Sequence, residues 1–178
     1  MTRYFLAFLC AFALLIPAAA YAETTIAVVD VQALLTKSAA AQSVEKQATA
    51  YKEKFLGQLS KQEQALRDTQ KKLTEDRAKM SKEDFEKKAQ DFEKKLLNTR
   101  EMAQKTKKDY DEASGKALNQ LRDKIVEIVQ GIATEKGYSL VISKQSVIVG
   151  SQSMDITEET MTRLNKALST ITLDLKDK

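Results

Sequence analysis

The sequence contains no histidine and no tryptophan, and its single cysteine and single proline both lie within the first 22 residues. A disulfide therefore cannot stabilise the rest of the chain, and structural zinc, which needs cysteine or histidine ligands, is excluded as well. Nucleophile arrangements built on cysteine or histidine are ruled out by the same absences. No glycine-rich phosphate-binding loop occurs. We therefore expect no catalytic residue, no cofactor and no metal, and the protein is not expected to be an enzyme.

Aromatic residues are also scarce. Beyond residue 22 there are only six, namely Tyr51, Phe55, Phe85, Phe92, Tyr110 and Tyr138. A compact monomeric core of ordinary size would need more large apolar side chains than these. Oligomerisation is the usual remedy when one chain cannot bury enough surface, so we expect a self-associating protein.

The first 22 residues have the features of an export signal. Arg3 supplies a positive start, an uninterrupted apolar run follows from Tyr4 to Ile16, and alanines flank Tyr21. The run is shorter than the ~20 apolar residues that a bilayer span needs. We therefore expect a signal peptide, residues 1–22, that is cleaved after Ala22.

Between Gln42 and Ile132 the sequence predicts two long amphipathic helices. Large apolar residues recur every seven positions in the first one, at Leu59, Leu66, Leu73 and Met80, which indicates a narrow coiled-coil seam. The residues from Ser81 to Asp84 form a capping box that restarts the helix, so the bend is expected near residues 80–81. At 1.5 Å per residue the helices would be roughly 58 and 77 Å long. Residues 44–116 are thus predicted to form an antiparallel helical hairpin, the arm.

Short β-branched segments lie on both sides of the arm. Residues 26–31 predict a buried strand, and two apolar triplets around residues 143–146 predict a β-hairpin, with Val147–Val149 as its second strand. Gly137 is placed to end the second long helix, and Thr157 to cap a last one.

The fold class predicted from these elements is mainly α, with a small β-containing body that carries the arm. Residues 23–43 and 117–178 would form this discontinuous α/β body. Its sheet edges would need to be paired or covered, which again favours a symmetric oligomer.

The outer part of the arm is basic. It has 15 Lys and Arg against 10 Asp and Glu between Lys61 and Lys108, with the lysine pairs Lys71 and Lys72, Lys87 and Lys88, Lys94 and Lys95. Two interpretations remain open: a solvated helix supported by Glu–Lys pairs, or a positive space that attracts anionic lipid or acidic segments of a bound chain. Met80, Phe85 and Phe92 likewise either fill the seam or contact non-native chains. Nucleic acid is not expected, because no base-reading or stacking motif occurs.

The two ends of the sequence resemble the Skp/OmpH family of periplasmic chaperones. The similar segments are Ile26 to Asp30, Tyr138 to Val147, and Asp155-Ile156-Thr157, on either side of the long charged hairpin. The resemblance implies a homotrimer whose arms form a cavity that holds unfolded outer-membrane proteins without ATP and prevents their aggregation. A lipopolysaccharide site has been proposed for the family, which makes lipopolysaccharide a candidate partner, but none of its residues is carried over to this sequence. The oligomerisation residues that it carries over are Ile26, Val28, Val29, Val31, Leu140, Val141 and Ile142.

An alternative function is a structural or adaptor coiled-coil protein of the cell envelope. Adaptors with helical hairpins usually carry glycine-rich β-domains on each side of the hairpin. The flanks of this hairpin are too short for such domains, so the holdase is the leading hypothesis.

Overall fold

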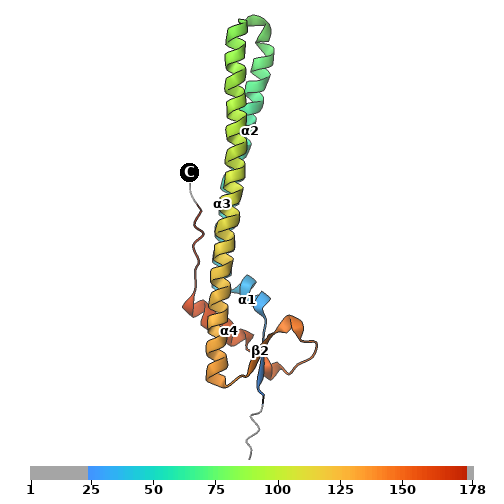
Figure 1. Cartoon of the computed structure of the whole chain (residues 1–178), viewed down its shortest axis with the longest axis vertical. Helices are drawn as coiled ribbons and strands as arrows, with labels where there is room; N and C mark the ends of the chain where they lie inside the picture. Colours follow the sequence, from blue (N-terminus) through green and yellow to red (C-terminus); the bar gives the residue numbers. More distant parts are fainter. Residues whose placement is uncertain (1–23, 176–178) are drawn as a thin grey trace, which may run out of the picture.

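The computed structural model describes residues 24–175, so the predicted signal peptide and its cleavage site lie outside the described residues. The elements run in the order β1 (Ile26–Val29), α1 (Val31–Lys37), α2 (Ala39–Glu75), α3 (Lys82–Lys136), β2 (Leu140–Ser143) and α4 (Thr157–Ala167). Figure 1 shows α2 and α3 rising together as one thin arm, while the other elements gather around the lower part of α3. The predicted fold class, mainly α with a small β component, is confirmed.

The arm consists of one helix of 37 residues and one of 55 residues. At 1.5 Å per residue these are about 55 and 80 Å long. The first helix starts where Ser38 accepts a hydrogen bond from the Ala41 amide at 3.2 Å. The second starts where Ser81 accepts one from the Asp84 amide at 3.0 Å, as the capping box predicted.

The reversal of the arm begins earlier than predicted. Helix α2 does not continue to Met80 but ends at Glu75, and Arg77–Lys79 form a 3₁₀ turn, η1. In this turn the Lys79 amide donates to the Asp76 carbonyl at 2.9 Å. The chain thus needs a tightened turn to bring the second helix back alongside the first.

Helix α3 ends as predicted. Gly137 has the left-handed backbone angles φ 69° and ψ 29°, and the next amide, of Tyr138, donates to the Ala133 carbonyl at 2.9 Å. Glycine adopts this conformation without a steric penalty, which is why it ends helices so often. The turn sends the chain directly into β2.

The two strands pair in parallel, in the register Ile26 with Leu140 through Val29 with Ser143. The predicted β-hairpin is therefore wrong. Residues 144–146 form a 3₁₀ turn, η2, that leads the chain away from β2, and Val147–Val149 form no strand. The predicted strand at residues 26–31 is also too long: Asp30 accepts from the Ala33 amide at 2.9 Å and caps α1, so Val31 belongs to that helix.

Helix α4 begins at Thr157, but the Thr157 side chain does not cap it. The hydroxyl instead accepts from the Asp30 amide at 2.8 Å, and the Asp155 carboxylate accepts from the Thr157 amide at 2.9 Å. The predicted role of Thr157 is thus wrong, because the neighbouring carboxylate reaches the first turn and the hydroxyl ties α4 to the start of α1. The backbone of Asp155 also forms an isolated parallel β-bridge with Val28.

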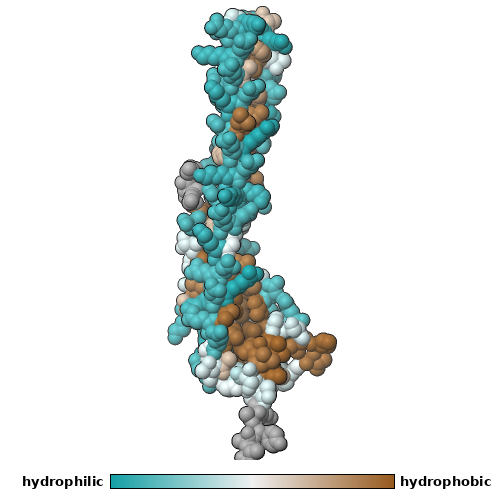
Figure 2. Space-filling model, viewed as in Figure 1, coloured by the Kyte–Doolittle hydropathy of each residue, from teal (hydrophilic) through white to brown (hydrophobic). Residues whose placement is uncertain are grey.

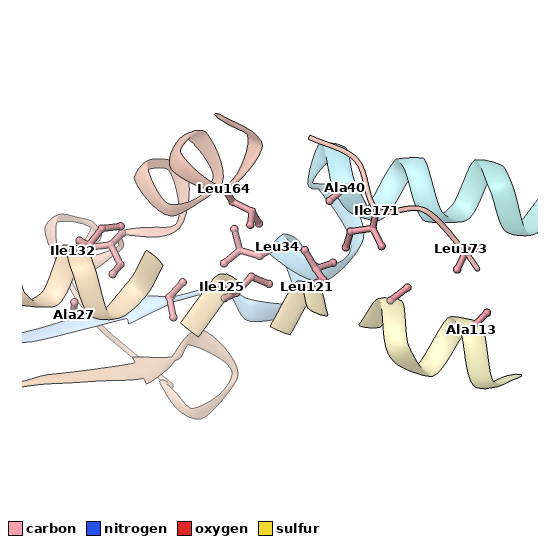
Figure 3. Packing of buried hydrophobic residues seen from close by; sticks show 13 residues of the cluster. Ala27, Leu34, Ala40, Ala113, Leu121, Ile125, Ile132, Leu164, Ile171 and Leu173 are labelled. Atoms are coloured by element: carbon pink, nitrogen blue, oxygen red, sulfur yellow. The ribbon is translucent and has the colours of Figure 1, made fainter. Parts of the chain in front are cut away.

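The buried core lies where the arm meets the strands and α4. Its largest fully buried apolar side chains come from four different segments, namely Leu34, Ile132, Leu164 and Ile171. Figure 3 shows Leu164 and Leu34 side by side in the middle of the cluster, with Ile132 toward one end and Ile171 toward the other. The apolar face of α3 contributes Ala113, Ala117, Leu121, Ile125 and Ile132.

Candidate functional site

The arm above this core has no fully buried residue. From residue 41 to residue 112 every side chain is exposed or half-buried, and half-buried positions recur at coiled-coil spacing along both helices. Leu59, Leu66 and Leu73 are such positions on α2, as are Phe85, Ala89 and Phe92 on α3. The two helices therefore contact each other along a narrow seam and leave most of their surface to solvent.

Near the tip, five of the sequence-predicted contact residues come together around one cavity of about 260 Å³. They are Lys72, Met80, Lys88, Phe92 and Lys95. The cavity also has two carboxylates in its lining, Asp76 and Asp91. The lining thus combines apolar side chains with three lysines, whose positive charge the two aspartates balance only in part. Such a surface suits a ligand that has both apolar and acidic groups.

The remaining predicted contact residues lie outside this cavity. Lys71 faces Glu75 at 3.8 Å in an exposed ion pair, and Phe85 lies under the Arg77 guanidinium, whose carbon is 5.2 Å from the ring centre. Lys87 and Lys94 are exposed on α3. Exposed pairs of this kind contribute at most about 1 kcal/mol, so these lysines stay available to an acidic partner.

Two further cavities along the arm were not predicted. One of about 320 Å³ lies beside Tyr51 and Tyr110, whose rings stack at 6.2 Å with an angle of 10° between their planes. The other, of about 410 Å³, is lined in part by Leu66 and Met102. Both tyrosines are half-buried, and only the packing of the two helices shows that they face each other.

At the opposite end, apolar side chains are exposed on the body. Ile148 is 100 % exposed and Val149 is 90 % exposed, and Leu140 on β2 is 50 % exposed. Figure 2 shows a continuous apolar area at the foot of the molecule, in contrast to the mostly hydrophilic arm. Large exposed apolar patches of this kind mark interaction sites. Of the predicted oligomerisation residues, Ile26, Val28 and Val29 lie on β1, and Leu140, Val141 and Ile142 on β2.

Charged groups hold the body together around α4. Arg163 donates to Glu135 at 2.8 and 2.7 Å and to Glu159 at 2.7 Å, while Lys136 also pairs with Glu159. The hydrogen bond from Arg163 lowers the pKa of Glu135, and the one from Lys136 lowers the pKa of Glu159. This network ties α4 to the last turns of α3 and so fixes where the arm leaves the body.

A second ionic contact fixes the loop beside β2. Lys144 donates to the Asp155 carboxylate at 2.7 Å, and this hydrogen bond raises the pKa of Lys144. The bonds from Lys144 and Thr157 lower the pKa of Asp155 to about 2. The loop that carries Ile148 and Val149 is thereby anchored at both of its ends.

The described residues contain no cluster of three or more potential metal ligands. Across residues 24–175, none of the helices combines the length and apolar character that crossing a bilayer requires.

Comparison with known proteins identifies the class. The profile of the family described as Outer membrane protein (OmpH-like) matches residues 25–164, so the chain belongs to the OmpH-like family. It is also similar to the crystal structure of a candidate outer membrane chaperone (OmpH-like) from Caulobacter crescentus. That comparison gives a TM-score of 0.78 and 17% identity, over 86% of this chain and 90% of the other. No curated protein matches the sequence.

Proposed function

We propose that this protein is an ATP-independent holdase chaperone of the periplasm. It would bind unfolded outer-membrane proteins and prevent their aggregation. One observation carries the proposal: helices of 37 and 55 residues form an arm in which no residue from 41 to 112 is fully buried. Such an arm contributes little to the core. Contact with another molecule therefore best explains its length and the cavities that its half-buried apolar residues line. Membership of the OmpH-like family supports the same conclusion.

The working unit would be a homotrimer assembled through the strands and the exposed apolar area of the body. Ile148 and Val149 are almost fully exposed, and β2 ends in a loop that carries both of them. Leaving such side chains in water is unfavourable by about 25 cal/mol per Å² of apolar surface. Neighbouring copies would cover them and place the arms around a shared space.

Binding inside that space would depend on many weak contacts. The tip cavity offers apolar surface at Met80 and Phe92 beside three lysines, and the cavity at Tyr51 and Tyr110 offers aromatic surface. Several weak contacts hold a chain firmly while each one exchanges rapidly. Binding withdraws the unfolded chain from aggregation by mass action, so no ATP is needed. Anionic lipid or lipopolysaccharide are further candidate partners of the same lysines.

Dilution of a urea-unfolded outer-membrane β-barrel protein into buffer tests this function. The purified mature protein should suppress light scattering when three copies are present per unfolded chain. Undiminished scattering at a several-fold excess of a folded, correctly assembled sample would refute the holdase function. An adaptor protein would give that negative result, so the experiment also separates the two candidate functions.

A further inference from the structure

The segment that follows α4 runs back along the base of the arm. Leu168 ends the helix, and Ile171 and Leu173 are then only 2% and 6% exposed. Both belong to the same buried cluster as Ala113 and Ala117 of α3. Figure 3 shows the two side chains pointing between α2 and α3, and Figure 1 shows the segment continuing upward beside the arm.

Burial alternates along this segment. Ile171 and Leu173 are buried and Leu175 is half-buried, whereas Thr172 and Asp174 between them are exposed. Apolar and polar residues therefore alternate with a period of two, the pattern of a strand with one buried face. The same pattern characterises the strands of outer-membrane β-barrels, which alternate between a lipid-facing and a lumen-facing side.

The side chain of Gln47 on α2 holds the backbone of this segment. Its amide nitrogen donates to the Ile171 carbonyl at 2.7 Å, and its amide oxygen accepts from the Leu173 amide at 3.0 Å. The two bonds lie on either side of Thr172, as the bonds of one residue do in a parallel strand pair. A side-chain amide thus takes the place of a neighbouring strand, and within the segment it hydrogen-bonds only backbone atoms. The same amide nitrogen also donates to the Ser43 hydroxyl on α2 at 3.2 Å.

We propose that the surface of α2 and α3 beneath this segment is a binding site for extended segments with alternating apolar residues, and that residues 169–175 occupy it in the free protein. We call the surface of Val44, Gln47, Ala48, Ala113 and Ala117 the tail site, after the segment that covers it. Backbone hydrogen bonds would supply affinity and the apolar surface would select side chains of alternate positions, as in other proteins that bind added strands. The occupant that displaces the tail would be a strand-forming segment of an unfolded β-barrel protein. This inference rests on the proposed function.

The covalently attached tail competes with any added strand. An attached segment has an effective concentration of about 1 mM, so a free peptide with a Kd of about 100 μM would bind roughly tenfold more weakly while the tail is in place. Client segments that present several strands overcome this competition. The tail would therefore keep the apolar surface covered until a client arrives.

Two variants with the same added charge distinguish a tail bound to its site from a released tail. Ile171→Asp with Leu173→Asp puts two carboxylates on the buried face, where burial of unpaired charge is strongly unfavourable. Thr170→Asp with Thr172→Asp puts the same charges on exposed positions. The probe is a fluorescent peptide with the sequence of residues 169–175, and a peptide of the same composition without the alternation serves as its control.

Fluorescence anisotropy should show that the first variant binds the alternating peptide about tenfold more tightly than the wild type, and that the second variant does not differ from the wild type. Adding Gln47→Ala to the first variant should remove the gain. Absence of binding to the first variant, with helical circular dichroism intact, would overturn the proposal, as would equal binding of the non-alternating peptide.

Hydrogen exchange on the unaltered full-length mature protein gives a second test that needs no variant. A bound unfolded β-barrel protein should lower the protection of the Leu173 amide, because the tail leaves its site. If the protein suppresses aggregation but this protection does not fall, the tail-site proposal is wrong while the holdase function stands.

Discussion

Replacing Asp155 by asparagine should destabilise the body in a pH-dependent way. The carboxylate accepts from Lys144 at 2.7 Å and from the Thr157 amide at 2.9 Å, and these bonds lower its pKa from the ordinary value of 3.8 to about 2. Asparagine keeps an oxygen for the Thr157 amide but loses the charge. The substitution therefore isolates the ionic part of the interaction.

The size of the effect follows from the difference between the two pKa values. A fall from 3.8 to about 2 corresponds to roughly 2.5 kcal/mol in the free energy of unfolding. The Asp155 side chain is 24% exposed and its partner Lys144 is 54% exposed, so water screens part of this interaction. We therefore expect Asp155→Asn to cost about 1 to 2 kcal/mol at pH 7.

The sign of the pH dependence is fixed because the pKa is lower in the folded state. The stabilisation is complete above the unfolded pKa of about 4, is about half lost near pH 3, and is nearly gone at pH 2. Urea unfolding followed by circular dichroism at 222 nm, at several pH values, measures the gap between wild type and variant. Asp123→Asn on the exposed surface of α3 is the control and should leave the stability unchanged. A gap of the same size at pH 7 and at pH 2 would refute this explanation.

Three further predictions concern the helices. Gly137→Ala should cost about 1 kcal/mol in urea unfolding because its φ is 69°, whereas Gly115→Ala within α3 should stabilise by about 0.5 to 1 kcal/mol; equal signs would contradict this reasoning. Ser81→Ala should cost about 1 kcal/mol locally and speed amide exchange in the first turn of α3, and unchanged exchange there would count against the cap. Replacing Lys72, Lys88 and Lys95, which line the tip cavity, with glutamine should weaken capture of an acidic unfolded chain roughly tenfold at low salt. The matched control replaces Lys71, Lys87 and Lys94, which lie outside the cavity, and should weaken capture less. An equal loss with both sets would show that the cavity has no special role.

Local sequence patterns predicted the long helices well. The start at Ser81 and the end at Gly137 each depend on residues within one helical turn, so their chemistry is visible in the sequence alone. The half-buried seam was also predictable, because its period of seven depends only on helix geometry. The end of α2 at Glu75 was not, because the residues from Asp76 to Lys79 have no strong helix-breaking chemistry.

Features that depend on distant residues were missed. The β-hairpin was predicted because two apolar triplets lie close together in sequence, but β2 pairs with β1, more than 100 residues away. Nothing local distinguishes these two choices, since an apolar strand accepts either neighbour. The contact of Gln47 with residues 171 and 173 was missed for the same reason. Of the predicted contact residues, the structure gathers five around the tip cavity, and the lysines at 71, 87 and 94 lie outside it because they project from other sides of the helices.

The central proposal is that each arm is one wall of a shared container for an unfolded chain. Native mass spectrometry of the mature protein, alone and with a urea-unfolded outer-membrane β-barrel protein, tests this most directly. We predict a trimer that takes up one client chain to give a complex of three copies and one client. A monomer that stays monomeric with client present, or a trimer that takes up none, would contradict the account.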